Sequence, residues 1–156
     1  MEDGFMRFLD GNEDAYEIMR NVREAHFPEL AGCRVKIIFD TKKRMTGGKI
    51  VLGSIQKPNE LTRFFMIDEA GDEEGFDYVV RLDKKCWDLI DLADKKRLMR
   101  HELKHTDVDF DATTPYKIRG HTIEDFYSEV TLNEDDPRWA ERAAQSTIAA
   151  YEQERA

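Results

Sequence analysis

His101, Glu102 and His105 form the pattern H-E-x-x-H, which is the arrangement in this chain best suited to chemistry. On a helix, the two histidines project from one face about 6 Å apart along the axis, so that both imidazoles can bind one metal ion. Zinc is the expected metal because it favours nitrogen ligands and accepts a low coordination number. Glu102 lies about 60° further round the helix. We therefore expect it to act as a general base on a water that the metal activates.

A catalytic zinc usually has three protein ligands, of which this pattern supplies two. His121 is the expected third ligand, because it follows the motif at a distance that lets the chain turn back over the site. Glu124 is the alternative, which would give a His-His-Glu site, and Asp125 is a weaker one. Either acid could instead accept a hydrogen bond from a ligand imidazole.

The aspartates that follow the motif suggest a second role. Asp107 is the one best placed to hold a ligand histidine by a hydrogen bond. The run from Asp107 resembles a calcium loop, but Ala112 stands at its sixth position, where that loop needs glycine, and Ile118 at its twelfth, where it needs glutamate. These two departures exclude an EF-hand.

The elements that must position the motif follow from helix signals around it. No proline, glycine or β-branched residue occurs from Asp94 to His105, and Asp91 or Asp94 can cap a helix that we expect to run to about Thr106. The helix separates a charged stripe from an apolar side. The stripe contains Arg97, Arg100 and Lys104, and the apolar side contains Leu98, Met99 and Leu103.

The rest of the chain alternates between helical and strand patterns. Asn12 can cap an N-terminal helix over about 13–27, Asp83 can cap a short helix, and Asp136-Pro137 begins a C-terminal helix over about 137–152 whose last residues fray. Alternating apolar residues predict strands over 33–39, 49–55 and 76–82. The period of residues 61–67 fits a strand or a short helix equally well. Together these patterns predict an α+β fold.

Composition narrows the class of protein. A chain of 156 residues predicts a single domain over 1–156, with a core over about 33–132. The net charge of −9 disfavours nucleic acid as a partner. Two isolated cysteines, Cys33 and Cys86, indicate buried apolar residues in a reducing compartment. No stretch has the pattern of a signal peptide or a membrane span, so we expect a cytoplasmic protein without a membrane partner.

Several stretches together resemble one family. They are Gly48 to Gly53, Phe76 to Val80, Trp87, Leu98 to His105, and Lys117 to Phe126, which contains His-x-Ile-Glu-Asp-Phe. Over roughly residues 33–132 the chain is similar to the putative phage metallopeptidases, which phages and prophage-bearing bacteria encode. The resemblance implies a zincin-like fold, in which a small mixed or antiparallel sheet packs against the H-E-x-x-H helix, and it supports His121 as a ligand.

Two classes of function are compatible with these features. The first is a zinc-dependent metallopeptidase, a hydrolase of peptides or proteins, with Glu102 as the base and with Tyr116 or Arg119 as the donor that stabilises the oxyanion. In this case the strand over 76–82 could bind substrate by strand addition if it forms the edge of the cleft. The alternative is a catalytically idle protein that keeps the zincin scaffold and antagonises a host protein. The intact Glu102 favours the peptidase.

Overall fold

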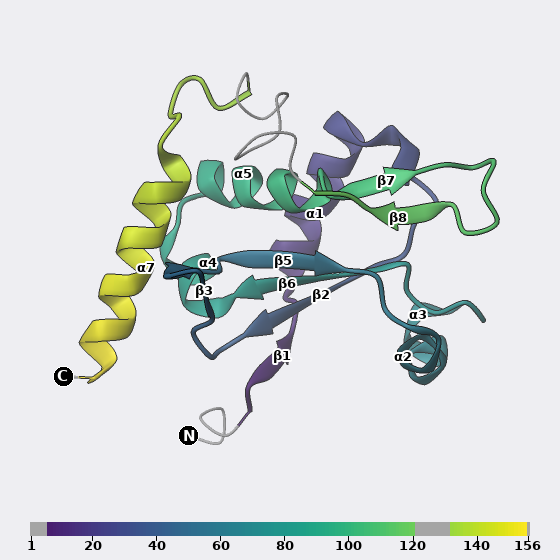
Figure 1. Ribbon diagram of the computed structural model, residues 1–156, viewed down its shortest axis with the longest axis horizontal. Coiled ribbons are helices and arrows are strands. Elements are labelled where there is room, and N and C mark those ends of the chain that lie inside the picture. The colour runs from purple at the N-terminus through teal and green to yellow at the C-terminus, as the bar shows by residue number, and fades with distance from the viewer. Residues whose placement is uncertain (1–5, 121–131, 156) are drawn as a thin grey trace.

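The structure is a computed structural model that describes residues 6–120 and 132–155, and it mixes helices and strands along the chain (Figure 1). The strands are β1 (Phe8–Asp10), β2 (Val35–Asp40), β3 (Met45–Thr46), β4 (Lys49–Ile50), β5 (Gly53–Gln56), β6 (Tyr78–Asp83), β7 (Thr106–Val108) and β8 (Tyr116–Ile118). The helices are α1 (Glu13–His26), the 3-10 helix η2 (Pro28–Leu30), α2 (Glu60–Phe65), α3 (Ile67–Ala70), α4 (Lys84–Leu89), α5 (Leu92–Leu103) and α7 (Trp139–Arg155). The α+β class expected from the sequence is confirmed.

A four-stranded sheet with the order β1-β2-β6-β5 forms the centre of the fold. β2 and β6 are parallel, whereas β1 and β5 run antiparallel to their neighbours. β6 is almost wholly buried, as a strand covered on both faces should be. Because β6 lies between β2 and β5, the strand over 76–82 is not an edge, and the condition set for strand addition to it is not met. The strand expected over 49–55 is also divided, because residues 45–50 form the separate β3–β4 hairpin and β5 alone joins the sheet.

The core lies between the sheet and the pair of helices α1 and α5, and α5 passes over the sheet in Figure 1. Both helices and the sheet supply buried side chains: Ile18, Met19 and Val22 from α1, Leu98, Met99 and Leu103 from α5, and Ile37, Val80 and Leu82 from the strands. The helix over 13–27 is confirmed, with Asn12 accepting a hydrogen bond from the Ala15 N–H (2.9 Å). Cys33 and Cys86 are buried, unpaired cysteines, as expected.

The motif helix is shorter than predicted. Asp91 caps its start by accepting a hydrogen bond from the Asp94 N–H (2.9 Å). It ends at Leu103, rather than near Thr106, because Thr106 pairs with Ile118 in the β7–β8 hairpin. The Thr106 hydroxyl also donates to the Leu103 carbonyl (2.6 Å). His105 thus lies in the turn between the helix and β7.

Two arginines of the charged stripe on this helix are buried. Arg97 and Arg100 are each only 9 % exposed. Arg97 pairs with Asp94 (2.8 Å), and Arg100 donates to the Asn133 side chain (2.5 Å). Arg142 also pairs with Asp94 (2.7 Å), so the network ties α5 to α7. The sequence analysis did not predict that these arginines are buried, because residues far along the chain, Asn133 and Arg142, take part in the network around them.

The C-terminal helix begins two residues later than expected, at Trp139, and continues to Arg155. Trp139, Ala143 and Thr147 are buried along one side of it. The turn before it places the Trp139 N–H on the Asp136 carbonyl (3.2 Å). Among the described residues, the chain contains no helix with the length and apolar character that a membrane span requires.

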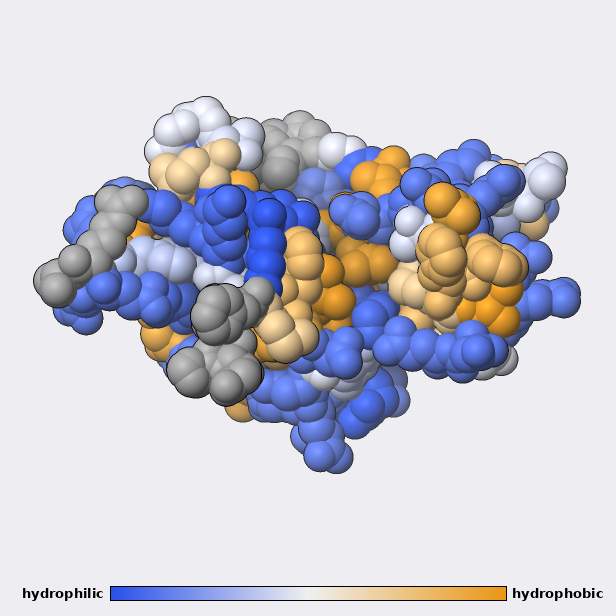
Figure 2. All heavy atoms as spheres, turned by 90° about the horizontal axis from the view of Figure 1, so that it is seen from below, coloured by the Kyte–Doolittle hydropathy of each residue, from blue (hydrophilic) through white to orange (hydrophobic). Residues whose placement is uncertain are grey.

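The segment over 61–67 is helical. Asn59 caps α2 by accepting a hydrogen bond from the Thr62 N–H (2.8 Å). This short helix buries none of its side chains and exposes Leu61, Phe64 and Phe65 to solvent. Figure 2 shows apolar side chains grouped on the surface at the end of the molecule where α2 lies.

A cluster of arginines surrounds Asp40 at the end of β2. Asp40 is 1 % exposed. It accepts hydrogen bonds from Arg7 (3.1 Å) and Arg81 (2.6 Å), and the Arg44 guanidinium lies 3.3 Å away. Burial by itself would raise the pKa of this carboxyl, but the hydrogen bonds from Arg7, the Lys42 N–H and Arg81 lower it to about 2. This carboxylate therefore joins β1, β2, β6 and the start of the β3–β4 hairpin.

Asp40→Asn should lower the free energy of unfolding by about 2 kcal/mol at pH 7, since it leaves three guanidinium groups without their counter-charge. The folded pKa lies below the unfolded value of about 3.9. The difference from the wild type should therefore be complete above that pH and shrink as the pH falls towards 2. Urea unfolding across this range measures it.

Asp88→Asn is the matched control, because Asp88 forms an exposed ion pair with Lys84. It should change stability by less than about 1 kcal/mol. An Asp40→Asn difference that stayed constant down to pH 2 would contradict an electrostatic role for Asp40.

Candidate metal centre

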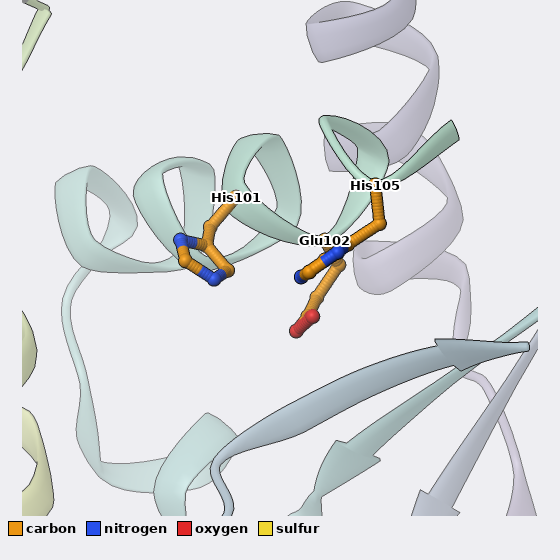
Figure 3. Close-up of side chains that lie close together, drawn as sticks. All are labelled: His101, Glu102 and His105. Atoms are coloured by element: carbon orange, nitrogen blue, oxygen red, sulfur yellow. The ribbon is translucent and has the colours of Figure 1, made fainter. Parts of the chain in front are cut away.

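The three motif residues meet at the end of α5. His101 and Glu102 occupy its last turn, and His105 stands in the turn that follows (Figure 3). One potential ligand atom from each residue can be chosen so that all three lie within 4.8 Å of one another. The imidazole centroids are 5.5 Å apart. Both rings can therefore bind one ion, although His105 reaches this place from a turn and not from the helix.

The β7–β8 hairpin holds the His105 ring in one orientation. Nδ1 of His105 lies 2.7 Å from the carbonyl oxygen of Arg119. A carbonyl can only accept, so Nδ1 carries the proton and the lone pair of the neutral ring is on Nε2. A ligand histidine usually has its second nitrogen held in this way, which fixes the tautomer and directs the other nitrogen at the metal. The local chemistry of His105 therefore suits a metal ligand.

Arg119 also secures the end of the helix. Its N–H donates to the His105 carbonyl (2.6 Å), and its Nε donates to the Lys104 carbonyl (2.8 Å). Carbonyls at the end of a helix need such partners, because the helix itself supplies none. Arg119 was predicted as a donor to an oxyanion. Its Nε is used in this contact, whereas the guanidinium has further N–H donors, so that role stays a prediction.

Glu102 points from α5 towards β5 (Figure 3) and is 3 % exposed. Space for its carboxylate depends on Gly53. A Cβ atom placed on Gly53 would lie 3.1 Å from Oε2 of Glu102, which is tighter than nine in ten real contacts of a Cβ atom. Glycine in a strand often marks such a close approach. Gly53 belongs to a stretch that resembles the family, but the sequence analysis gave it no role. A glycine inside a predicted strand was the signal that could have indicated a close approach at this position.

Burial raises the pKa of Glu102 to about 8, and the Arg44 charge acts weakly in the opposite direction. A carboxyl with this pKa is largely protonated at neutral pH. A divalent cation at the two histidines would act with Arg44 and favour the charged form. Cation binding and the readiness of Glu102 to accept a proton are therefore coupled.

Asp107 and Tyr116 lie in the two strands of the β7–β8 hairpin. Asp107 is exposed in β7, and Nδ1 of His105 contacts the Arg119 carbonyl, so the role of Asp107 stays a prediction. The Tyr116 ring packs against Tyr78, and its hydroxyl lies 3.9 Å from a Cβ position on Gly32. The role of Tyr116 as an oxyanion donor stays a prediction. His121, Glu124 and Asp125 fall within 121–131, outside the described residues.

Comparison with known proteins identifies the family. A family model with the description "Putative phage metallopeptidase" matches residues 7–151, and the chain belongs to this family. The match extends beyond the 33–132 expected from the sequence and includes α1 and most of α7. No curated protein matches the chain, and no solved structure does. The family and the His-Glu-x-x-His cluster together point to a metal-dependent peptidase.

Zinc titration of metal-free protein should show one equivalent bound per chain. His101→Ala and His105→Ala should each weaken binding by roughly tenfold or more, since each removes a nitrogen ligand. Zinc at 100 times its Kd should also stabilise the folded wild type by about 2.7 kcal/mol, which thermal unfolding with and without chelator measures. His26→Ala is the control, because His26 ends α1 and lies outside the cluster. Equal zinc binding by all three variants would rule out the site.

Proposed function

We propose that the chain is a zinc-dependent peptidase with a zincin-like fold, encoded by a phage or prophage and acting on peptides or proteins in the cytoplasm. The observation that carries the proposal is the H-E-x-x-H cluster, in which His105 is oriented for a ligand role and Glu102 is buried against β5. Membership of the family supports the same chemistry. Zinc is proposed because the motif offers two imidazole nitrogens, which this ion prefers.

His101 and His105 would hold the ion together with His121, or with Glu124 as the alternative third ligand. Asp125 would then be a partner of a ligand. Zinc analysis of His121→Ala and Glu124→Gln decides between the two, since only loss of the true ligand should lower the zinc content sharply. A bound zinc ion supplies Lewis acidity, which acidifies water and polarises a peptide carbonyl.

Glu102 would supply the proton transfers. Its carboxylate accepts a proton from the attacking water and then passes it to the amine that leaves. Its burial between α5 and Gly53 excludes solvent and fixes its position. These features are those a general base and acid needs.

The substrate would bind along β5, the strand at the edge of the sheet beside Glu102. The Asp83 N–H donates to the Leu52 carbonyl (2.8 Å), which makes these two residues a hydrogen-bonded pair. Such pairs alternate along an antiparallel ladder, so Gly53 and Ile55 direct their N–H and C=O groups away from β6. An extended peptide can pair with these groups by strand addition. β5 thus takes the role first predicted for the strand over 76–82.

Glu102→Gln tests the peptidase directly. Glutamine keeps the size of the side chain but cannot accept the proton. The variant should fold, bind zinc as the wild type does, and lose about 10²–10⁴-fold in kcat/KM on a peptide substrate. Loss of zinc binding would instead make Glu102 a ligand. If the variant keeps every biological effect of the wild type, the alternative of an idle scaffold that antagonises a host protein is correct.

Gly53→Ala tests the fit between β5 and Glu102. The added methyl group should push the Glu102 carboxylate aside, while the two histidines keep their positions. We expect normal zinc binding and a roughly 10- to 100-fold lower kcat, because small displacements of a reacting group have large effects. Gly32→Ala is the control, since nothing lies nearer than 3.9 Å to a Cβ at that position. Unchanged kcat in Gly53→Ala would contradict the close fit.

A further inference from the structure

A groove of about 710 Å³ lies between the β3–β4 hairpin and the first half of α7. Its apolar lining comes from Ile50 and Leu52 on the hairpin side and from Ala140, Ala144 and Ile148 on the helix. The volume falls in the range of about 300–1,000 Å³ that is usual for binding pockets. The space is therefore large enough for more than one side chain of a bound peptide.

The helix contributes to this groove with residues that the core does not use. Trp139, Ala143 and Thr147 are buried and face the body of the protein. Ala140, Ala144 and Ile148 each follow one of these by a single residue, so they form a second stripe along the helix. Two of the three are alanines, which leave the groove open rather than filling it. α7 therefore directs an apolar stripe at the groove, bordered by Glu141 and Gln145, in addition to its face in the core.

The groove reaches the proposed active site through Leu52. Leu52 lines the groove and precedes Gly53, which contacts Glu102. A peptide paired with the outer groups of Gly53 and Ile55 that continues past Gly53 therefore arrives at the groove. At the rim, Arg138 and Glu141 form an ion pair (2.7 Å), so their charges largely cancel. The occupant that fits is a continuation of the substrate with an apolar side chain.

We infer that this groove binds the substrate segment on one side of the scissile bond and selects an apolar residue there. The inference rests on the proposed peptidase function and names the class of substrate: extended or unfolded polypeptide with a large apolar side chain close to the cleaved bond. The edge of β5 recognises the main chain and is indifferent to sequence. The groove supplies the preference, because burying an apolar side chain in it is favourable and burying a polar one is not.

Ala144→Trp tests this inference by filling the groove with a large ring. Ala149→Trp is the matched control, because Ala149 is exposed on the same helix and does not line the groove. Both substitutions are made in Glu102→Gln protein, in which peptides bind without being cut, and in active protein loaded with zinc. The probes are fluorescent unstructured decapeptides that carry leucine or phenylalanine at one position, each compared with its serine counterpart.

In the Glu102→Gln background we expect the apolar peptides to bind about tenfold more tightly than their serine counterparts, as a filled apolar pocket provides. Ala144→Trp should remove that difference and Ala149→Trp should keep it. In active protein, mass spectrometry should show cleavage at a fixed distance from the apolar residue, and Ala144→Trp should lose this preference. Ile148→Ser removes apolar surface without adding bulk and should act in the same direction, so it replaces Ala144→Trp if that variant does not fold.

The outcomes separate the two proposals. If the wild type cleaves with an apolar preference and Ala144→Trp retains that preference, the proposed role of the groove is overturned while the peptidase function stands. If Ala144→Trp abolishes the preferential binding of apolar peptides but no metal-loaded protein cleaves them, the groove is supported as a peptide-binding site and the proposed peptidase function is overturned. Equal binding of the apolar and serine peptides by the wild type overturns the groove.

Discussion

The site depends on the contact between the end of α5 and Arg119, the residue that directly follows the β7–β8 hairpin. Arg119 donates to the Lys104 and His105 carbonyls, and its own carbonyl accepts from the His105 ring. One residue therefore both closes the helix and fixes a potential ligand. Without this contact the Lys104 and His105 carbonyls would lose these donors, and the His105 ring would lose the acceptor that sets its tautomer.

The second constraint is the short distance between α5 and the edge of the sheet. Glu102 fits there because β5 presents Gly53 at the point of contact. The same strand directs two residues' main-chain groups outward and leads back through Leu52 into the groove beside α7. The position of a single strand thus relates the base, the proposed path of the substrate and the proposed source of selectivity. The central β6 cannot bind a further strand, since it already pairs with β2 and β5.

Local signals predicted most of the helices and the identity of the motif. Asn12, Asp83 and Asp91 cap the helices that they were expected to cap. The spacing of His101 and His105 predicted that the two imidazoles lie close together, although His105 stands in the turn after the helix. Contacts between distant parts of the chain could not be predicted in this way. The order of the strands, the burial of Arg97 and Arg100, and the early end of α5 all depend on partners that lie far away in sequence.

The same limit applies within the site. Gly53 and the Arg119 carbonyl shape the surroundings of the motif, yet one acts by lacking a side chain and the other through its main chain. A pattern of side-chain types records neither property. His121, Glu124 and Asp125 show the converse, because the sequence names them clearly as candidates while the described part of the structure does not contain them.

The hairpin clamp also has an evolutionary consequence. The pairing of Thr106 with Ile118 sets where the carbonyl of Arg119, the residue after Ile118, lies relative to the His105 ring. Insertions or deletions at the tip, over residues 109–115, leave this register intact and should be accepted freely among relatives. A change of one residue within the paired positions would turn the main chain to its other face and move the carbonyl off the ring. Natural variants of this family should therefore differ in the length of the hairpin tip. The residue whose carbonyl contacts the His105 ring should still directly follow the Thr106–Ile118 pair.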